Sequence, residues 1–295
     1  MKDECRVGFS IESKASVEGR RVTLLGLGCH GGGVAAARWL ARQGALVTVT
    51  DLADETALAD SLALLADVPI ARYRLGGHDE RDFREAELVV VNPAVRLDDP
   101  YVKAAAQSGA AITSEIELFL RRCRAHVVGV TGSNGKSTTA AMTAEILSAA
   151  GRCVWLGGNI GRSLLDDLAQ IGRDDWVVLE LSSFQLSWLA DDARWPETFV
   201  ITNCTLNHLD WHGSFDHYTS AKQRLLLRQP PDGLAVLNPL DPLVGGWAPL
   251  ARGRCVAVLD ECPVAQLAVP GEHNRVNAAL AASAAGALGC TLAAI

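Results

Sequence analysis

Short apolar runs alternate with longer amphipathic stretches along this chain. The apolar runs are four to six residues long and show no strict alternation of polar and apolar positions, which is typical of strands buried on both faces of a sheet. The stretches between them have the length and periodicity of crossover helices. The pattern therefore predicts an α/β fold in which the sheets are mainly parallel.

The apolar runs fall into two sets. In the first set we expect strands at 21–25, 46–50 and 88–91, with helices at 33–43, 55–66 and 101–108. In the second set we expect strands at 126–130, 176–181, 199–203, 234–237 and 254–259. The polar segment RRCRA at 121–125 separates the two sets, so we expect one domain over residues 1–124 and another over residues 125–295.

Composition narrows the class of protein. A chain of 295 residues with 49% hydrophobic content can bury the cores of two domains. The formal net charge is −7 and basic residues form no run, so we expect no nucleic-acid partner. The eight cysteines form no C-x-x-C pair and the first residues, MKDECRVGFSIESKAS, have no apolar core of a signal peptide. We therefore expect a cytoplasmic protein with reduced thiols.

Residues 278–295 carry no charge over a length that could span a bilayer. The segment consists mostly of Ala, Ser, Gly and Thr, so its transfer into lipid would be weakly favoured. A buried helix is the better interpretation, and we expect no membrane span.

A glycine-rich turn follows the first strand. Gly26, Gly28 and Gly31 match G-x-G-x-x-G between a strand and a helix, and Asp51 ends the next strand about twenty residues later. Such a turn lets a helix N-terminus meet phosphate oxygens, and the acid can meet a ribose hydroxyl. This favours a Rossmann-like first domain, and NAD, FAD, a nucleotide sugar or a merely structural turn all remain open.

A second loop begins the second set of elements. In HVVGVTGSNGKSTT an apolar strand leads into Gly132 and Gly135, and Lys136 and Ser137 open an Ala-rich helix. Backbone N–H groups of such a loop cradle phosphates, the lysine neutralises their charge and the hydroxyl binds Mg²⁺. Val130 stands where the Walker pattern has glycine, so this P-loop-type domain has a variant loop.

Three further candidates follow apolar strands, at the edge of a parallel sheet where ligands bind. They are Glu180, His208 and Lys222. A carboxylate after a phosphate loop suits Mg²⁺, which prefers oxygen ligands. Taken singly, each could lack a functional role. Glu180 could be a structurally paired acid, His208 a loop histidine and Lys222 a solvated cation on a helix.

Several motifs together resemble the Mur ligases, the cytoplasmic enzymes that build the peptide stem of peptidoglycan. The motifs are VTGSNGKSTT, then GGNIG at 157–161, LELSSFQL at 179–186 and NHLD at 207–210, with TSEIELF at 113–119 and GEHNRVNA at 271–278. They occur in the order found in the family, and ELSSFQL is most similar to the branch that adds D-glutamate.

The resemblance implies an ATP site with two Mg²⁺ ions. The implied ATP-binding residues are Gly132, Ser133, Asn134, Gly135, Lys136, Ser137, Thr138, Asn274 and Asn277. The implied metal ligands are Ser137 and Glu180 for one ion, and His208 and Lys222 for the other, with Lys222 carbamylated. Lys136, Glu180, His208 and Lys222 are the implied catalytic residues. Addition of CO₂ to a neutral lysine amine gives a carboxylate-like ligand, which requires a lowered lysine pKa.

The resemblance also implies UDP-N-acetylmuramoyl-L-alanine and D-glutamate as partners of a monomer. The first domain then becomes a UDP-substrate domain. The matching positions are Cys29, His30, Asp51 and Asn92 in the first domain and Asn159 and Ser182 in the second.

The implied reaction joins D-glutamate to the UDP-linked substrate through an acyl phosphate. The C-terminal amino-acid-binding domain of the family has no counterpart within the 295 residues, so we expect a truncated form or a fragment. Three alternatives stay open: a non-catalytic module that binds a UDP-sugar and ATP, a ligase like folylpolyglutamate synthase, and a dehydrogenase. The dehydrogenase leaves the phosphate loop unexplained.

Overall fold

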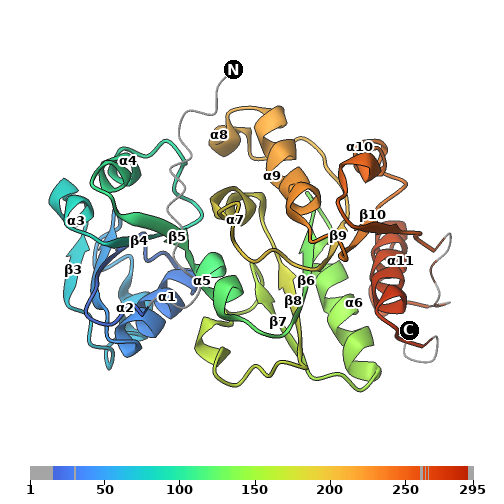
Figure 1. The fold of residues 1–295 in the computed structure, drawn as a ribbon, viewed down its shortest axis with the longest axis horizontal. Helices are drawn as coiled ribbons and strands as arrows, with labels where there is room; N and C mark the ends of the chain where they lie inside the picture. The colour runs from blue at the N-terminus through green and yellow to red at the C-terminus, as the bar shows by residue number, and fades with distance from the viewer. Residues whose placement is uncertain (1–15, 30, 260–261, 263, 265, 292–295) are drawn as a thin grey trace. The chain divides into compact units, whose positions relative to one another are not determined.

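The computed structural model describes residues 16–29, 31–259, 262, 264 and 266–291. It divides the chain into two compact units (Figure 1). The first unit comprises Met1–Cys123, Leu165–Ala169 and Ser187–Arg194, and the second comprises Arg124–Leu164, Gln170–Leu186 and Trp195–Ile295. Each unit contains one sheet, whose paired strands are all parallel. The predicted α/β class is confirmed.

The sheet of the first unit has the strand order β3-β2-β1-β4-β5. Its strands are β1 (Arg21–Leu25), β2 (Leu46–Asp51), β3 (Arg72–Leu75), β4 (Leu88–Val91) and β5 (Ala111–Ser114). The helices are α1 (Gly32–Arg42), α2 (Ala59–Ala63), α3 (Glu80–Arg84), α4 (Pro100–Gln107) and α5 (Glu115–Arg122). The carboxyl ends of β1, β2 and β4 therefore lie side by side and bring their loops to one edge.

Two later segments of the chain are tied into this first unit by ion pairs. Arg38 on α1 donates to Asp166 at 2.6 Å, and Asp166 belongs to the 3-10 turn η1 (Leu165–Asp167). Arg121 on α5 pairs with Glu117 at 2.7 Å and with Asp192 at 2.8 Å. The chain thus returns twice to the first unit after its second sheet has begun.

The sheet of the second unit has the strand order β11-β10-β9-β6-β8-β7. Its strands are β6 (His126–Thr131), β7 (Val154–Gly158), β8 (Trp176–Glu180), β9 (Thr198–Ile201), β10 (Leu234–Leu237) and β11 (Arg254–Val256). The α-helices that follow these strands are α6 (Lys136–Ala149), α7 (Ser183–Trp188), α8 (Leu209–His212), α9 (Phe215–Arg228), α10 (Pro242–Gly245) and α11 (Glu272–Ala287), with a short 3-10 helix η2 (Ala248–Leu250). Since β6 lies between β8 and β9, the phosphate loop leaves the sheet beside Glu180.

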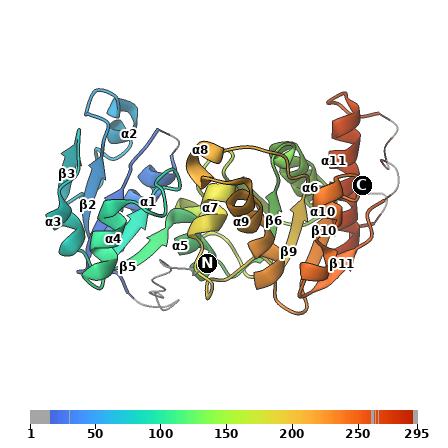
Figure 2. The same cartoon turned by 90° about the horizontal axis from the view of Figure 1, so that it is seen from above.

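Helices α6 and α11 lie side by side (Figures 1 and 2). Both are rich in alanine, and their buried faces join one core with the central strands, including Ala140, Leu147, Val178, Leu280 and Ala284. Small side chains let the two helices approach closely. Residues 278–287 of the uncharged segment thus belong to a packed helix, as the sequence predicted. Within the part of the chain that the structure describes, no helix has the length and apolar content needed to cross a membrane.

One predicted helix is largely wrong. Of the helix expected at 55–66, only α2 at Ala59–Ala63 forms. Asp54 accepts a hydrogen bond from the Ala57 backbone N–H at 2.9 Å, which holds the preceding residues in a turn and delays the helix. The strand expected at 254–259 is also shorter, since β11 ends at Val256.

Candidate functional site

The glycine-rich turn of the first unit is packed against Asn92. Gly26, Gly28 and Gly31 all have positive φ angles, of 86°, 63° and 85°. A Cβ at Gly26 would lie 2.8 Å from the Cβ of Asn92. The close approach of α1 to the turn depends on Gly33, where a Cβ would overlap the Leu27 carbonyl oxygen. The sequence motif did not single out Gly33, although it is the last of three consecutive glycines.

Asp51 and Asn92 hold this turn through its backbone. Asp51 Oδ2 accepts from the Gly28 N–H at 3.0 Å and Oδ1 from the Ala53 N–H at 2.9 Å. The Asn92 amide donates to the Gly26 carbonyl at 3.3 Å. Cys29 is exposed beside them, whereas His30 lies outside the described residues. Cys29, Asp51 and Asn92 therefore gather at one sheet edge.

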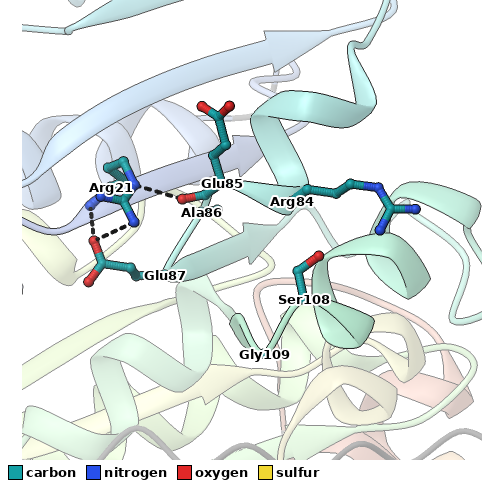
Figure 3. A pocket seen from close by; sticks show the side chains of 7 residues that line it. All are labelled: Arg21, Arg84, Glu85, Ala86, Glu87, Ser108 and Gly109. Atoms are coloured by element: carbon teal, nitrogen blue, oxygen red, sulfur yellow. Dashed lines mark hydrogen bonds and ion pairs between the residues drawn. The ribbon is translucent and has the colours of Figure 1, made fainter.

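A hollow of about 510 Å³ in the first unit lies at the opposite edge of the sheet, at the amino ends of β1 and β4 (Figure 3). It is lined by Arg21, Arg84, Glu85, Ala86, Glu87, Ser108 and Gly109. Arg21 donates to the Glu85 carbonyl at 2.7 Å, and its backbone N–H donates to Glu87 at 3.0 Å. Ligands of parallel α/β sheets bind at the carboxyl ends of the strands, so the hollow is not the candidate site.

The phosphate loop of the second unit turns tightly between β6 and α6. Gly132 has a φ of 154° and Gly135 a φ of 78°. A Cβ at Gly132 would overlap Thr202 Oγ1, and one at Gly135 would lie 2.5 Å from Asn277 Oδ1. The two glycines therefore allow the loop to pack directly against its neighbours.

Lys136 folds back over this loop. Its Nζ donates to the Ser133 carbonyl at 2.9 Å. Burial lowers the pKa of Lys136 below its ordinary value, while nearby Glu180 opposes that shift. Lys136 lies at the start of α6, where the N–H groups of the first helical turn have no intrahelical acceptor. The arrangement suits a phosphate chain.

Glu180 ends β8 and is only 2% exposed. Its Oε2 accepts from Ser137 Oγ at 2.6 Å, and its Oε1 accepts from the Asn159 amide at 2.9 Å. Carboxylate and hydroxyl oxygens thus converge beside the phosphate loop, which is the donor set that Mg²⁺ prefers. Asn159 therefore orients this carboxylate.

Lys222 on α9 is buried, with 1% of its surface exposed. Its Nζ donates to the Gly132 carbonyl at 2.9 Å and lies 4.5 Å from the centre of the Tyr218 ring. Burial, assisted by the charge of Lys136, lowers the pKa of Lys222 to about 7. A large share of this amine is therefore neutral near pH 7, the form that reacts with CO₂.

His208, unlike the buried Lys222, lies at the surface. It precedes α8 in a left-handed conformation with a φ of 52°, is exposed, and its ring lies 4.8 Å from that of Phe184. Its ring centre is 6.3 Å from that of Tyr218, which Lys222 also approaches. Within the described ranges, no group of three or more His, Cys, Asp or Glu side chains is arranged to hold a metal ion.

Asn274 and Asn277 are buried near the start of α11. The Asn274 amide donates to the Pro270 carbonyl at 2.9 Å, and the Asn277 amide donates to Asn274 Oδ1 at 3.3 Å. Asn277 also lies against Gly135. Asn277 therefore lies beside the phosphate loop, and Asn274 is bonded to Asn277.

Ser182 lies at the start of a different helix. Its Oγ accepts a hydrogen bond from the Gln185 N–H at 3.2 Å and so caps α7.

Two buried side chains of the second unit, one against the phosphate loop and one against α7, were missed in the sequence. The Tyr218 hydroxyl lies 2.7 Å from Ser133 Oγ, and His212 Nε2 lies 3.0 Å from Ser183 Oγ. Both are buried. Each follows NHLD within ten residues, but no spacing rule links an aromatic or imidazole side chain at these positions to the phosphate loop or to the start of α7.

The burial of His212 leads us to expect that the free energy of unfolding falls in acid. Burial, assisted by Lys222 and other histidines, lowers its pKa to about 4. Between about pH 6.5 and 4 the unfolded chain binds a proton that the folded chain excludes, so the free energy of unfolding should fall as the pH falls. Urea unfolding across this range should show a shallower fall for His212→Gln. His126→Gln, at the exposed start of β6, is the control; equal slopes for His212→Gln and wild type would contradict the prediction.

Comparison with known protein families gives two matches. Residues 20–114 match the "Mur ligase MurD-like, N-terminal domain", and residues 130–260 match the "Mur ligase middle domain". Together the matches cover most of the chain and both sheets. The chain belongs to the Mur ligase family. The second match covers the phosphate loop, which the dehydrogenase interpretation leaves unexplained, and the first match covers the separate N-terminal domain, which the folylpolyglutamate synthase interpretation lacks.

Curated Mur ligases show the same relationship. The chain is 39% identical over 298 residues to the UDP-N-acetylmuramoylalanine–D-glutamate ligase of Geobacter metallireducens, covering 93% of this chain and 65% of the relative. It is 44% identical over 225 residues to the ligase of the same name from Trichlorobacter lovleyi, covering 76% of this chain and 49% of the relative. The chain thus spans between about half and two thirds of the length of these relatives.

A solved ligase structure shares the fold. The UDP-N-acetylmuramate:L-alanyl-gamma-D-glutamyl-meso-diaminopimelate ligase from Neisseria meningitides superposes with a TM-score of 0.63 at 19% identity. The match covers 93% of this chain and 95% of that chain. This structure confirms the predicted fold, whereas the domain matches confirm the predicted family.

Proposed function

We propose that this chain forms the UDP-substrate and ATP-binding part of a cytoplasmic ligase that joins D-glutamate to UDP-N-acetylmuramoyl-L-alanine. One observation carries the proposal: the phosphate loop, the Ser137–Glu180 pair and the buried amine of Lys222 meet at one sheet edge. The names of the curated relatives support the same substrate and amino acid.

ATP would bind along the phosphate loop. Lys136 would exchange its bond to the Ser133 carbonyl for contacts with phosphate oxygens, and the first turn of α6 would supply N–H donors. The buried pair Asn274 and Asn277 would face the adenine from the other side of Gly135. Ser133, Asn134 and Thr138 would complete the loop.

Mg²⁺ fits the oxygen donors of this site. Ser137 and Glu180 would hold one ion, and His208 together with a carbamylated Lys222 would hold a second. When bound, the ions would spread the negative charge that develops on the transferred phosphoryl group. The lowered pKa of Lys222 supports carbamylation because only a neutral amine adds CO₂.

The reaction would proceed in two displacements. A carboxylate oxygen of the UDP-linked substrate attacks the γ-phosphorus, the bond to the bridging oxygen of ADP breaks, and an acyl phosphate forms. The D-glutamate amine then attacks the acyl carbon, loses a proton and expels phosphate. Lys136 would stabilise charge in the first displacement.

The first unit would bind the uridine diphosphate part of the substrate. Gly26 and Gly28 shape its turn, and Cys29, His30, Asp51 and Asn92 are the proposed contacts. Asn159 and Ser182 would face the muramoyl part, and Asn159 would also keep Glu180 oriented.

Phosphate release with UDP-N-acetylmuramoyl-L-alanine, ATP and Mg²⁺, with and without D-glutamate, tests the proposal. We expect phosphate release only when all components are present. Because the chain spans only part of its relatives, a second candidate is a module that binds both nucleotides without turnover. Tight binding of both ligands without phosphate release would favour that module, and binding of neither would refute both proposals.

A further inference from the structure

The phosphate loop is held from one side by the segment that follows β9. The Ser133 N–H donates to the Asn203 carbonyl at 3.0 Å. Ser133 Oγ donates to the Thr205 carbonyl at 3.0 Å and accepts from the Thr205 N–H at 2.9 Å. Residues 202–205 therefore run alongside residues 133–134, and we call them the brace segment.

The side chain of Asn203 forms two hydrogen bonds to the backbone of Asn134. Its Oδ1 accepts from the Asn134 N–H at 2.9 Å, and its Nδ2 donates to the Asn134 carbonyl at 2.9 Å. Thr202 Oγ1 donates to the same carbonyl at 2.6 Å. One side-chain amide thus holds both the backbone N–H and the backbone carbonyl of Asn134.

These contacts divide the N–H groups of the loop into two sets. The N–H groups of Ser133 and Asn134 are bound to Asn203. The following N–H groups, in the first turn of α6, lie where a helix supplies no backbone acceptor. Phosphate oxygens would then be received by the groups from Gly135 onward, while the two residues before them anchor the loop.

The anchor matters because glycines flank it. Gly132 and Gly135 both adopt positive φ, and glycine loses more conformational freedom on ordering than other residues. A loop that must be ordered when ATP arrives binds more weakly than one already held in the receiving conformation. Asn203 can hold the loop in that conformation, because it is hydrogen-bonded to Asn134 between the two glycines.

We propose that Asn203 is a positioning residue for ATP, which holds Asn134 so that the N–H groups from Gly135 onward face the phosphates before the nucleotide binds. The proposal rests on the proposed ATP site and adds a role for a side chain outside the phosphate loop. Asn203 itself would touch no substrate.

Asn203→Ala should raise the Kd for Mg·ATP on the order of tenfold, because two hydrogen bonds to the loop are lost. Asn203→Asp should bind no better than the Ala variant, since its carboxylate would face the Asn134 carbonyl oxygen. Leu206→Ala, which truncates a side chain 67% exposed in the same loop, should leave the Kd unchanged. Calorimetric titration of each chain with Mg·ATP gives these constants.

Two readouts separate positioning from a general loss of structure. The thermal midpoint of Asn203→Ala should stay within a few degrees of wild type, and where the wild type turns over, excess ATP should restore its kcat. Hydrogen exchange of the nucleotide-free wild type should show protected amides at Ser133 and Asn134. Rapid exchange there, or an unchanged Kd in Asn203→Ala, would overturn the proposal; failure of the wild type to bind ATP would instead overturn the proposed function.

Discussion

Lys136→Ala should lower ATP-driven phosphate release by about a thousandfold or more. Lys136 is bonded to the loop of the proposed phosphate site, and electrostatic stabilisation of the transferred group is the largest contribution to such reactions. The substitution removes the charge and the bond to the Ser133 carbonyl but leaves the turn of the first unit untouched. Binding of the UDP-linked substrate, measured by calorimetry, should therefore persist.

The matched control is Lys103→Ala, which removes an exposed lysine from α4 of the first unit. It should retain wild-type phosphate release. Turnover of Lys136→Ala at the wild-type rate would exclude the loop as the ATP site. Loss of UDP-substrate binding together with turnover would indicate a folding defect, which circular dichroism would reveal.

Lys222→Met should abolish ligation and, in CO₂-free buffer at pH 6, raise the free energy of unfolding. Lys222 is buried and its pKa is lowered to about 7, so the folded chain binds its proton more weakly than the unfolded chain does. This cost to stability is complete below about pH 7 and disappears as the pH rises toward the ordinary lysine pKa near 10.4. Methionine fills similar space without charge, and loss of the bond to the Gly132 carbonyl reduces the gain.

Urea unfolding at several pH values measures the effect. The stability advantage of Lys222→Met over wild type should be largest near pH 6 and smaller by several kcal/mol near pH 10. Lys103→Met, at the exposed position on α4, is the control and should show little change. A difference independent of pH would show that Lys222 is not a destabilised buried cation. In ¹³C-bicarbonate, a carbamate signal present in wild type and absent in Lys222→Met would support the proposed modification.

The central features of the second unit were accessible from the sequence because local patterns determine them. Strand β6, the glycines after it and helix α6 are consecutive, so the phosphate loop could be predicted from one stretch. Glu180 could be placed because the end of a buried strand has a fixed position in a parallel sheet. The predicted strands at 21–25 and 88–91 agree with β1 and β4 for the same reason.

Other elements depend on contacts that a single stretch does not contain. Strand β3, RYRL, alternates arginine with apolar residues and gave no apolar run. Arg72 and Arg74 instead pair with buried Asp82, at 2.9 and 2.5 Å, which stabilises this edge strand through a later helix. The sequence around Lys222 likewise has the polarity of an exposed helix face. Its burial follows only from the packing of α9 against the phosphate loop.

The ion pairs that tie late segments into the first unit bear on how the protein can be divided for experiments. A cut after residue 124 would separate Asp166 from Arg38 and Asp192 from Arg121. Glu117 would remain with Arg121, but its acceptance from the Ala190 N–H at 3.0 Å would also be lost. The fragment 125–295 made by that cut would therefore carry residues 165–169 and 187–194 without their native partners. The free energy of unfolding measured for this fragment would be lower than that of the same residues in the intact chain.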